Sequence, residues 1–533
     1  MFARSWPTAW AAVARGRRAA AAGPTTAMLI VSSRHGLWQR YGPDGVHAIE
    51  QAVGVLAEAL AARGISGTPL YVDDSPLLSL LGVLPARAGD PVDVARVIRE
   101  VAARLALTDE HARFALLLGD DAIVPFHRLA NAADDDDEAV LSDQPYAVDG
   151  DDLARPVRAV GRLPDCGFDL LIASLHAAAA AHRQLAAGEC PAGAEAFGYS
   201  ASFWKRAARG AYGAIDAPNR LRLSPPLAHP DVPHPGADGP RFRYYNLHGL
   251  VDAPEWFGQR DPGFGANAPE FPVALRPEDI GCVPGAVVMS EACHGARLID
   301  RAPSDAIALS YLAGGALAFV GATGVAYGGI GDGPLLGADL LAQRFWRSLL
   351  AGRPAGEALA HAKVDLVSET MARQGYLDAE DEKAVANFVL LGDPSLSHHA
   401  PPGGQGAARG HGDGVMAGPE GAMGAPPARS IPLARSGTHR ISDGRAPEAL
   451  AEHVRRAVAR QLPGFGGDDV RVRLAGGHGS LGSARGAPPG RARDHVVVTL
   501  SRTVRTCAGP CCPTVLRVTV DGHGRIRKMA VSR

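Results

Sequence analysis

One cysteine and one histidine stand out because each follows an apolar run. Cys293 ends the stretch GAVVMSEAC, and His248 ends the stretch RFRYYNLH. The His-Gly dipeptide occurs six times in the chain, so the run before His248 carries the signal and the dipeptide does not. Cysteine is a strong nucleophile near neutral pH, and histidine is the usual proton carrier beside it. The pair therefore predicts acyl transfer through thiol attack with acid–base help from an imidazole.

A parallel sheet would bring these two residues together. Apolar runs at 27–33, 69–74 and 114–121 alternate with helical patterns at 46–60 and 92–107. Uninterrupted apolar strands that alternate with helices predict an α/β fold with a doubly wound, mostly parallel sheet in two subdomains. The carboxyl ends of such strands share one edge, where ligands bind, and both His248 and Cys293 follow strands. The uncharged stretch 306–331 is interpreted as a buried helix followed by a buried strand.

The same residues also allow structural or metal-binding roles. A cysteine after a strand can be a small buried hydrophobe, and a histidine can be a hydrogen-bonded framework residue. His248, Cys293 and His294 could also hold zinc, although the chain lacks a fourth ligand at suitable spacing. His294 could compete with His248 as the imidazole that serves Cys293.

Charge and composition divide the chain. Residues 447–533 hold 15 basic and 6 acidic side chains, whereas the preceding part holds 39 basic and 50 acidic ones. We expect a leader at 1–26 that is disordered, a main domain at 27–400 with a subdomain boundary near 190, and a Gly/Pro/Ala-rich linker at 401–446. A small basic α+β domain at 447–533 completes the chain, and its charge suggests an acidic partner.

Several stretches together resemble the gingipain-type cysteine peptidases, a family with a caspase-like fold. The His-Gly and Ala-Cys strand ends match its pattern, and so do LLLGDDAIVPF, SDQPYAVDGDDLARPVRAVGRLP and FVLLGDPSL, in the family's order. The resemblance covers roughly residues 27–400. It implies a cysteine endopeptidase in which Cys293 is the nucleophile and His248 the general acid/base, with Gly249 and Cys293 donating backbone N–H groups to the oxyanion.

The resemblance also implies a pocket for the residue before the cleaved bond (P1). Glu291 lies two residues before Cys293, and an acid there would pair with Arg or Lys at P1. Strand alternation places Glu291 and Cys293 on one face if the strand continues through them. Asp143 is the second candidate. Glu291 could instead orient a backbone amide, and Asp143 could be a loop cap or a calcium ligand.

The remaining expectations concern ligands, partners and location. No cofactor is expected to be required, although the acidic loops at 134–138 and 149–152 could bind Ca²⁺. Cys507, Cys511 and Cys512 could bind zinc with His523, or remain free thiols. We expect a protein or peptide substrate, no membrane and no nucleic acid. Seven scattered cysteines favour the cytoplasm, with secretion as the alternative. Competing functions are a catalytically silent scaffold and a CHAT-type peptidase that acts in a partner complex.

Overall fold

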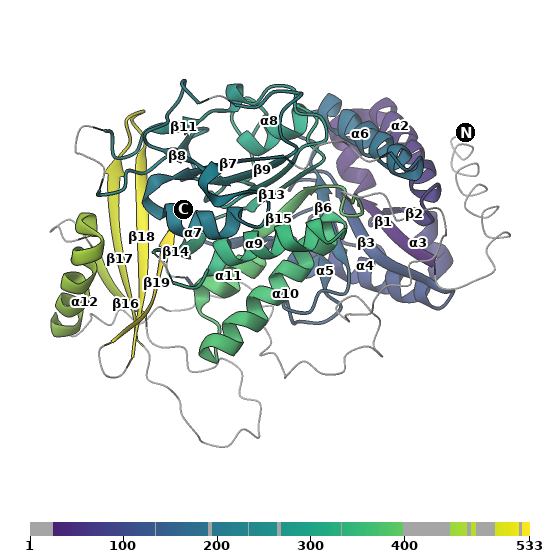
Figure 1. The fold of residues 1–533 in the computed structure, drawn as a ribbon. Coiled ribbons are helices and arrows are strands. Elements are labelled where there is room, and N and C mark those ends of the chain that lie inside the picture. Colours follow the sequence, from purple (N-terminus) through teal and green to yellow (C-terminus); the bar gives the residue numbers. More distant parts are fainter. Residues whose placement is uncertain are drawn as a thin grey trace, which may run out of the picture.

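A ten-stranded sheet forms the centre of the protein in the computed structural model (Figure 1). The structure describes residues 25–133, 135–189, 195–232, 234–263, 268–331, 333–397, 448–465, 471–475, 496–521 and 525–533. The strand order is β2-β1-β3-β6-β15-β13-β12-β9-β7-β8. In that order the strands are β2 (Ile65–Tyr71), β1 (Thr25–Ser32), β3 (Glu110–Leu118), β6 (Ala159–Leu163), β15 (Phe388–Gly392), β13 (Ala318–Ala322), β12 (Val287–Ser290), β9 (Phe242–Asn246), β7 (Ala196–Ala201) and β8 (Arg222–Ser224).

Two parallel halves meet at one antiparallel pair. β15 runs antiparallel to β13, and every other neighbouring pair in this sheet is parallel. β9 and β12 are direct neighbours in the second half, paired from Phe242 with Val287 to Tyr245 with Ser290. The carboxyl ends of these two strands therefore lie side by side, as the sequence predicts.

Helices cover both faces of the sheet. Figure 1 shows α2 (Arg34–Ala61), α6 (Phe168–Ala186) and α8 (Ile307–Ala313) above it. Below it lie α3 (Pro76–Leu81), α4 (Pro91–Ala106), α5 (Gln144–Ala147), α7 (Lys205–Tyr212), α9 (Gly337–Leu350), α10 (Ala355–Gln374) and α11 (Ala379–Asn387). The strands are buried on both sides because helices pack on each face, which is why their sequences are mostly apolar. Short strands pair outside the main sheet: β4 (His127–Leu129) with β5 (Val140–Ser142), and β10 (Trp256–Phe257) with β11 (Val273–Leu275).

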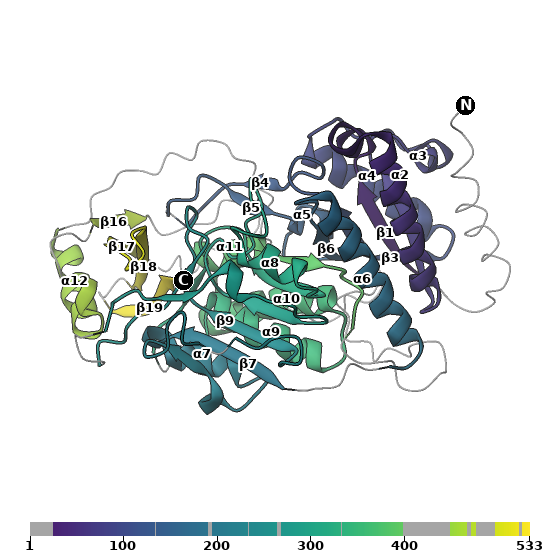
Figure 2. The same cartoon turned by 90° about the horizontal axis from the view of Figure 1, so that it is seen from above.

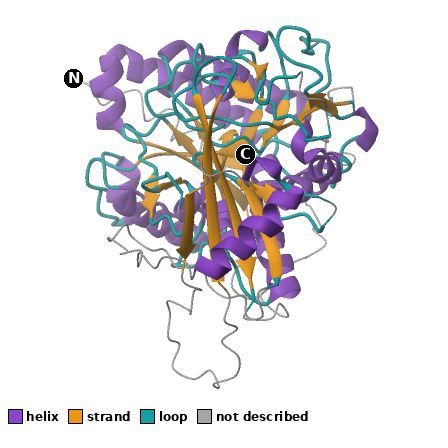
Figure 3. Ribbon diagram, turned by 90° about the vertical axis from the view of Figure 1, so that its left-hand side faces the viewer, coloured by secondary structure: helices purple, strands orange, loops and turns teal. Residues whose placement is uncertain are grey.

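A second, five-stranded antiparallel sheet stands at one end of the molecule (Figure 2). Its order is β14 (Tyr327–Gly329), β19 (Ile526–Ser532), β18 (Cys511–Val520), β17 (Val496–Arg505) and β16 (Arg471–Ala475). Helix α12 (Glu448–Gln461) packs on it, and Figure 3 views the molecule from that side. β14 comes from the middle of the chain, so this sheet joins the C-terminal region to the region that holds Cys293.

The structure confirms the predicted α/β class with its large, mostly parallel sheet. It also confirms a helix and a strand within 306–331, as α8 and β13. Among the described residues no helix is long and apolar enough to cross a membrane. The predicted leader up to residue 24, the linker at 401–446 and the predicted boundary near 190 fall outside the described residues.

Candidate active site

Neighbouring strands deliver the two residues singled out from the sequence. His248 lies two residues beyond the end of β9, and Cys293 lies three residues beyond the end of β12. Only 1% of the His248 surface and 4% of the Cys293 surface are exposed. Both side chains therefore lie at the same edge of the sheet, and other parts of the chain shield both from solvent.

The Cys293 thiol contacts the backbone of the segment that leads into β14. Its Sγ accepts a hydrogen bond from the Ala326 N–H at 3.2 Å and lies 3.6 Å from the Ala326 carbonyl oxygen. Burial raises the pKa of the thiol to about 12, against the lowering effect of the Ala326 hydrogen bond. Cys293 is therefore a neutral thiol near neutral pH in this arrangement.

The His248 ring is held between aromatic side chains. Its centroid lies 4.6 Å from that of Trp204 and 5.2 Å from that of Phe271. Nε2 lies 3.0 Å from Oε1 of Gln259. Burial lowers the pKa of His248 to about 3, although the hydrogen bond with Gln259 acts in the opposite direction. The imidazole is therefore neutral, and proton transfer from the Cys293 thiol to it is unfavourable while both groups stay buried.

Close backbone approach shapes the space between the two residues. A Cβ atom at Gly249 would lie 2.0 Å from the carbonyl oxygen of Cys293, so only glycine fits there. The backbone N–H of Cys293 points at the carbonyl oxygen of Arg533, 3.4 Å away. His248 also hydrogen-bonds the backbone of Arg533. A main-chain oxygen of Arg533 therefore lies where both the N–H of Cys293 and the His248 imidazole reach the main chain of this residue.

The side chain of Arg533 fills a buried acidic pocket next to this carbonyl. Its Nη2 donates to both carboxylate oxygens of Asp339, at 2.6 and 2.8 Å, and to the Gly329 carbonyl at 3.1 Å. Its guanidinium lies 4.4 Å from the centre of the Trp204 ring, a cation–π contact. Asp339 comes from the first turn of α9, and Trp204 comes from the single-turn 3-10 helix Ser202–Trp204 that precedes α7.

Glu291 lies on the other side of this guanidinium. One of its oxygens is 3.7 Å from Arg533 Nε, while Tyr244 and Asn246 donate hydrogen bonds to it at 2.6 and 3.0 Å. Burial and the neighbouring charge of Asp339 raise the pKa of Glu291 well above its usual value. Two carboxyl groups this close cannot both ionise cheaply. Glu291 therefore keeps its proton, and the close ion pair in the pocket is the one between Asp339 and Arg533.

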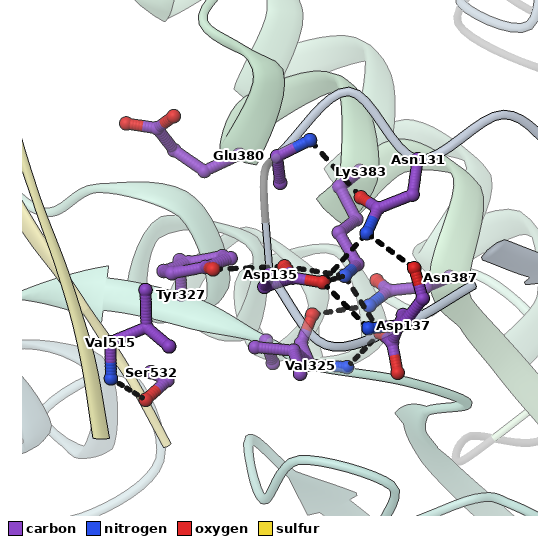
Figure 4. Close-up of polar contacts among 12 residues, drawn as sticks. Asn131, Asp135, Asp137, Val325, Tyr327, Glu380, Lys383, Asn387, Val515 and Ser532 are labelled. Carbon is purple, nitrogen blue, oxygen red and sulfur yellow. Dashed lines mark hydrogen bonds and ion pairs between the residues drawn. The ribbon is translucent and has the colours of Figure 1, made fainter. Parts of the chain in front are cut away.

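An ion cluster fixes the segment that faces Cys293 (Figure 4). Lys383 Nζ lies 2.7 Å from carboxylate oxygens of both Asp135 and Asp137. Asp137 then accepts the Val325 N–H at 2.7 Å, and Asp135 accepts the Tyr327 hydroxyl at 2.8 Å. Because these groups are buried, the cluster restrains the backbone from Val325 to Tyr327, which holds both the thiol contact and the start of β14.

Asp143, the second candidate for the P1 pocket, lies beside Arg162. Its carboxylate forms a buried ion pair with Arg162 at 2.6 and 3.0 Å. His294 is also placed differently from His248: its backbone has a positive φ of 55°, and its Nε2 lies 3.8 Å from Asp137. His294 thus faces the ion cluster, whereas His248 faces the carbonyl of Arg533.

Sequence reasoning missed Asp339, Trp204 and the strand β14. In the structure, Gly328 of β14 lies against the Arg533 guanidinium: a Cβ there would be 1.9 Å from Nη2.

The candidate metal positions have other contacts. Among the described residues no group of three or more His, Cys, Asp or Glu side chains is placed to hold a metal ion. The ammonium group of Lys383 neutralises Asp135 and Asp137 in the acidic loop considered for Ca²⁺. Cys507 and Cys511 are exposed and Cys512 is buried, while His523 falls outside the described residues.

Comparison with known proteins bears on the region around Cys293. Residues 282–399 match the model of peptidase family C25. This match confirms the resemblance to the gingipain family drawn from the motifs and supports a cysteine peptidase. No curated protein sequence matches the chain.

Three solved structures are similar to this chain at low sequence identity. A structure described as a protease is 10% identical, with a TM-score of 0.46, over 95% of this chain and 97% of that one. The Arg-specific cysteine proteinase gingipain R is 10% identical, with a TM-score of 0.45, over 96% and 91% of the two chains. The complex of Porphyromonas gingivalis RgpB pro- and mature domains is 13% identical, with a TM-score of 0.45, over 70% and 81%.

Proposed function

We propose that this protein is a cysteine endopeptidase that cleaves after arginine. The observation that carries the proposal is the position of Arg533. Its carbonyl oxygen lies against the Cys293 N–H while its guanidinium lies between Asp339 and the Trp204 ring. A substrate arginine in the same place would present its scissile carbonyl to the thiol.

The proposed reaction uses an acyl-enzyme. The Cys293 sulfur attacks the carbonyl carbon after His248 accepts the thiol proton, and the Cys293 N–H stabilises the oxygen that gains charge. Gly249 is the proposed second backbone donor. His248 then returns the proton to the departing amine, which leaves a thioester on Cys293. Water, activated by the same imidazole, hydrolyses the thioester and frees the thiol.

The pocket favours arginine over lysine on geometric grounds. A planar guanidinium can stack on Trp204 and at the same time donate to Asp339 and the Gly329 carbonyl, as Arg533 does. An ammonium group is compact and more strongly hydrated, and it cannot make the stacked contact in the same way. We therefore propose arginine as the preferred P1 residue and lysine as a weaker one.

The test is hydrolysis of fluorogenic peptides that differ only at P1, carrying Arg, Lys, Asp or Asn. The assay uses both the 533-residue chain and its Arg533→Ala variant, in which the pocket is free. We expect turnover in the order Arg, then Lys, with none for Asp or Asn, and loss of all turnover when Cys293→Ala is added. Preferential cleavage after Asp or Asn would contradict the pocket assignment. Turnover that persists in Cys293→Ala would contradict the nucleophile.

A further inference from the structure

The C-terminal strand of this chain lies in the groove as a peptide substrate would. β19 pairs antiparallel with β14, with Ser532 opposite Tyr327, Val531 opposite Gly328 and Ala530 opposite Gly329. The Arg533 N–H continues the ladder by donating to the Ala326 carbonyl at 3.0 Å. Addition of a strand to an exposed sheet edge is a common way to bind an extended peptide.

We propose that residues 530–533 occupy the P4 to P1 subsites of the active site and inhibit the enzyme in cis. The inhibition, though not the occupancy, rests on the proposed function. The occupant is a named segment of this chain, bound through backbone pairing to β14 and through the Arg533 side chain in the acidic pocket. With Cys293 and His248 almost fully buried beneath it, no second peptide can reach them.

Buried ion pairs hold this segment in place from behind. Lys528, on β19, lies 2.6 Å from a carboxylate oxygen of Asp378 and 2.8 Å from one of Asp381. Arg517, on β18, pairs with Glu380 at 3.0 Å. The basic C-terminal region therefore finds its acidic partner in α11 and the residue before it, within the same chain.

Apolar contact closes the other side of the site. Cys512 on β18 and the partly buried Val504 on β17 pack with Leu250, Phe257 and Phe271 around the segment that follows His248. Because the whole region is tethered, the effective concentration of the occupying segment is high, and a free peptide must compete with it. A substrate can replace this segment only after β19 dissociates from β14.

Alkylation of Cys293 by iodoacetamide tests occupancy without assuming any peptidase activity. Peptide mass spectrometry follows each cysteine separately, and the exposed Cys282 serves as an internal standard. Arg533→Ala removes the pocket contacts, and we expect it to raise the Cys293 rate relative to Cys282 by about tenfold or more, as loss of a charge-assisted contact implies. Arg527→Ala is the matched control, since Arg527 lies on the same strand, is exposed and pairs with Asp521.

Gly328→Ala separates the occupying segment from the pocket. Its new methyl group would meet the guanidinium of any arginine there, so we expect Cys293 alkylation to rise as in Arg533→Ala. Hydrolysis of a peptide with Arg at P1 should rise only in Arg533→Ala, because Gly328→Ala also excludes the substrate arginine.

The outcomes distinguish the two proposals. Faster alkylation in Arg533→Ala without any hydrolysis would support occupancy and contradict the proposed peptidase. Full hydrolysis by the 533-residue chain, unchanged in Arg533→Ala, would support the peptidase and overturn inhibition by the C-terminal segment. Equal alkylation of Cys293 and Cys282 in the unmodified chain would also overturn it.

Discussion

Asp339 and Glu291 surround the same guanidinium, yet the structure predicts different results when each is replaced by its amide. Asp339 forms the close ion pair and accepts two hydrogen bonds from one arginine nitrogen, whereas Glu291 keeps its proton and one of its oxygens lies 3.7 Å from Arg533 Nε. Asp339→Asn therefore removes the charge that a P1 arginine needs. Glu291→Gln replaces a neutral acid by a neutral amide of the same shape.

The magnitudes follow from burial. Both carboxyl groups are fully buried, and the loss of one partner from a buried, hydrogen-bonded charge pair costs about 2–5 kcal/mol. For Asp339→Asn this corresponds to a fall in kcat/KM of about 30-fold to several thousand-fold. For Glu291→Gln we expect a change within about fivefold, because no charge is lost.

The assay compares peptides with arginine and with citrulline at P1, in the Arg533→Ala background. Citrulline has nearly the shape of arginine without its charge, so Asp339→Asn should abolish most of the preference for arginine and leave citrulline cleavage nearly unchanged. Equal losses in the two variants, or a larger loss in Glu291→Gln, would refute the assignment of the charge to Asp339.

Three further predictions concern the framework of the site. Lys528→Met leaves buried carboxylates unpaired and should lower the free energy of unfolding by about 3–5 kcal/mol, with faster amide hydrogen exchange in β19. Arg527→Ala, on the same strand, should leave both quantities nearly unchanged. Burial and acidic neighbours raise the pKa of Glu382 to about 7. The stability that Glu382 contributes is therefore full below pH 4.5, its pKa in the unfolded chain, and is lost as the pH rises through 7. Glu382→Gln should accordingly stabilise the fold by about 1–3 kcal/mol at pH 8 and have little effect at pH 4, by urea unfolding. Asp143→Asn should destabilise the fold through Arg162 by about 3–5 kcal/mol without changing the Arg-to-Lys ratio in hydrolysis; a changed ratio would return Asp143 to the pocket.

The sequence predicts the part of the site that depends on single strands. Apolar runs ending in His248 and Cys293 reveal two buried strands, and parallel pairing then requires their ends to meet. The resemblance to the gingipain-type peptidases points to Glu291, two residues before Cys293, although β12 ends at Ser290. The protonation of Glu291 could not be predicted from the sequence, since its raised pKa depends in part on Asp339, which comes from α9.

The residues that sequence reasoning missed depend on contacts between distant elements. Asp339 reaches the pocket from the first turn of α9, and Arg533 reaches it across a strand pairing between β14 and β19. No local pattern encodes such a pairing. Asp143, which the family resemblance suggested for the P1 pocket, lies between β5 and α5, and its pairing with Arg162 likewise joins elements that are distant in the sequence.

The most direct measurement of the central claim is covalent labelling of Cys293 by peptidyl chloromethyl ketones that carry arginine or aspartate at P1. The arginyl reagent should label Cys293 in Arg533→Ala much faster than the aspartyl reagent, and the label should be found on the Cys293 peptide by mass spectrometry. Asp339→Asn should remove this preference. Labelling that is equally fast with both reagents, or that falls on a different cysteine, would contradict the account of an arginine-directed thiol at this site.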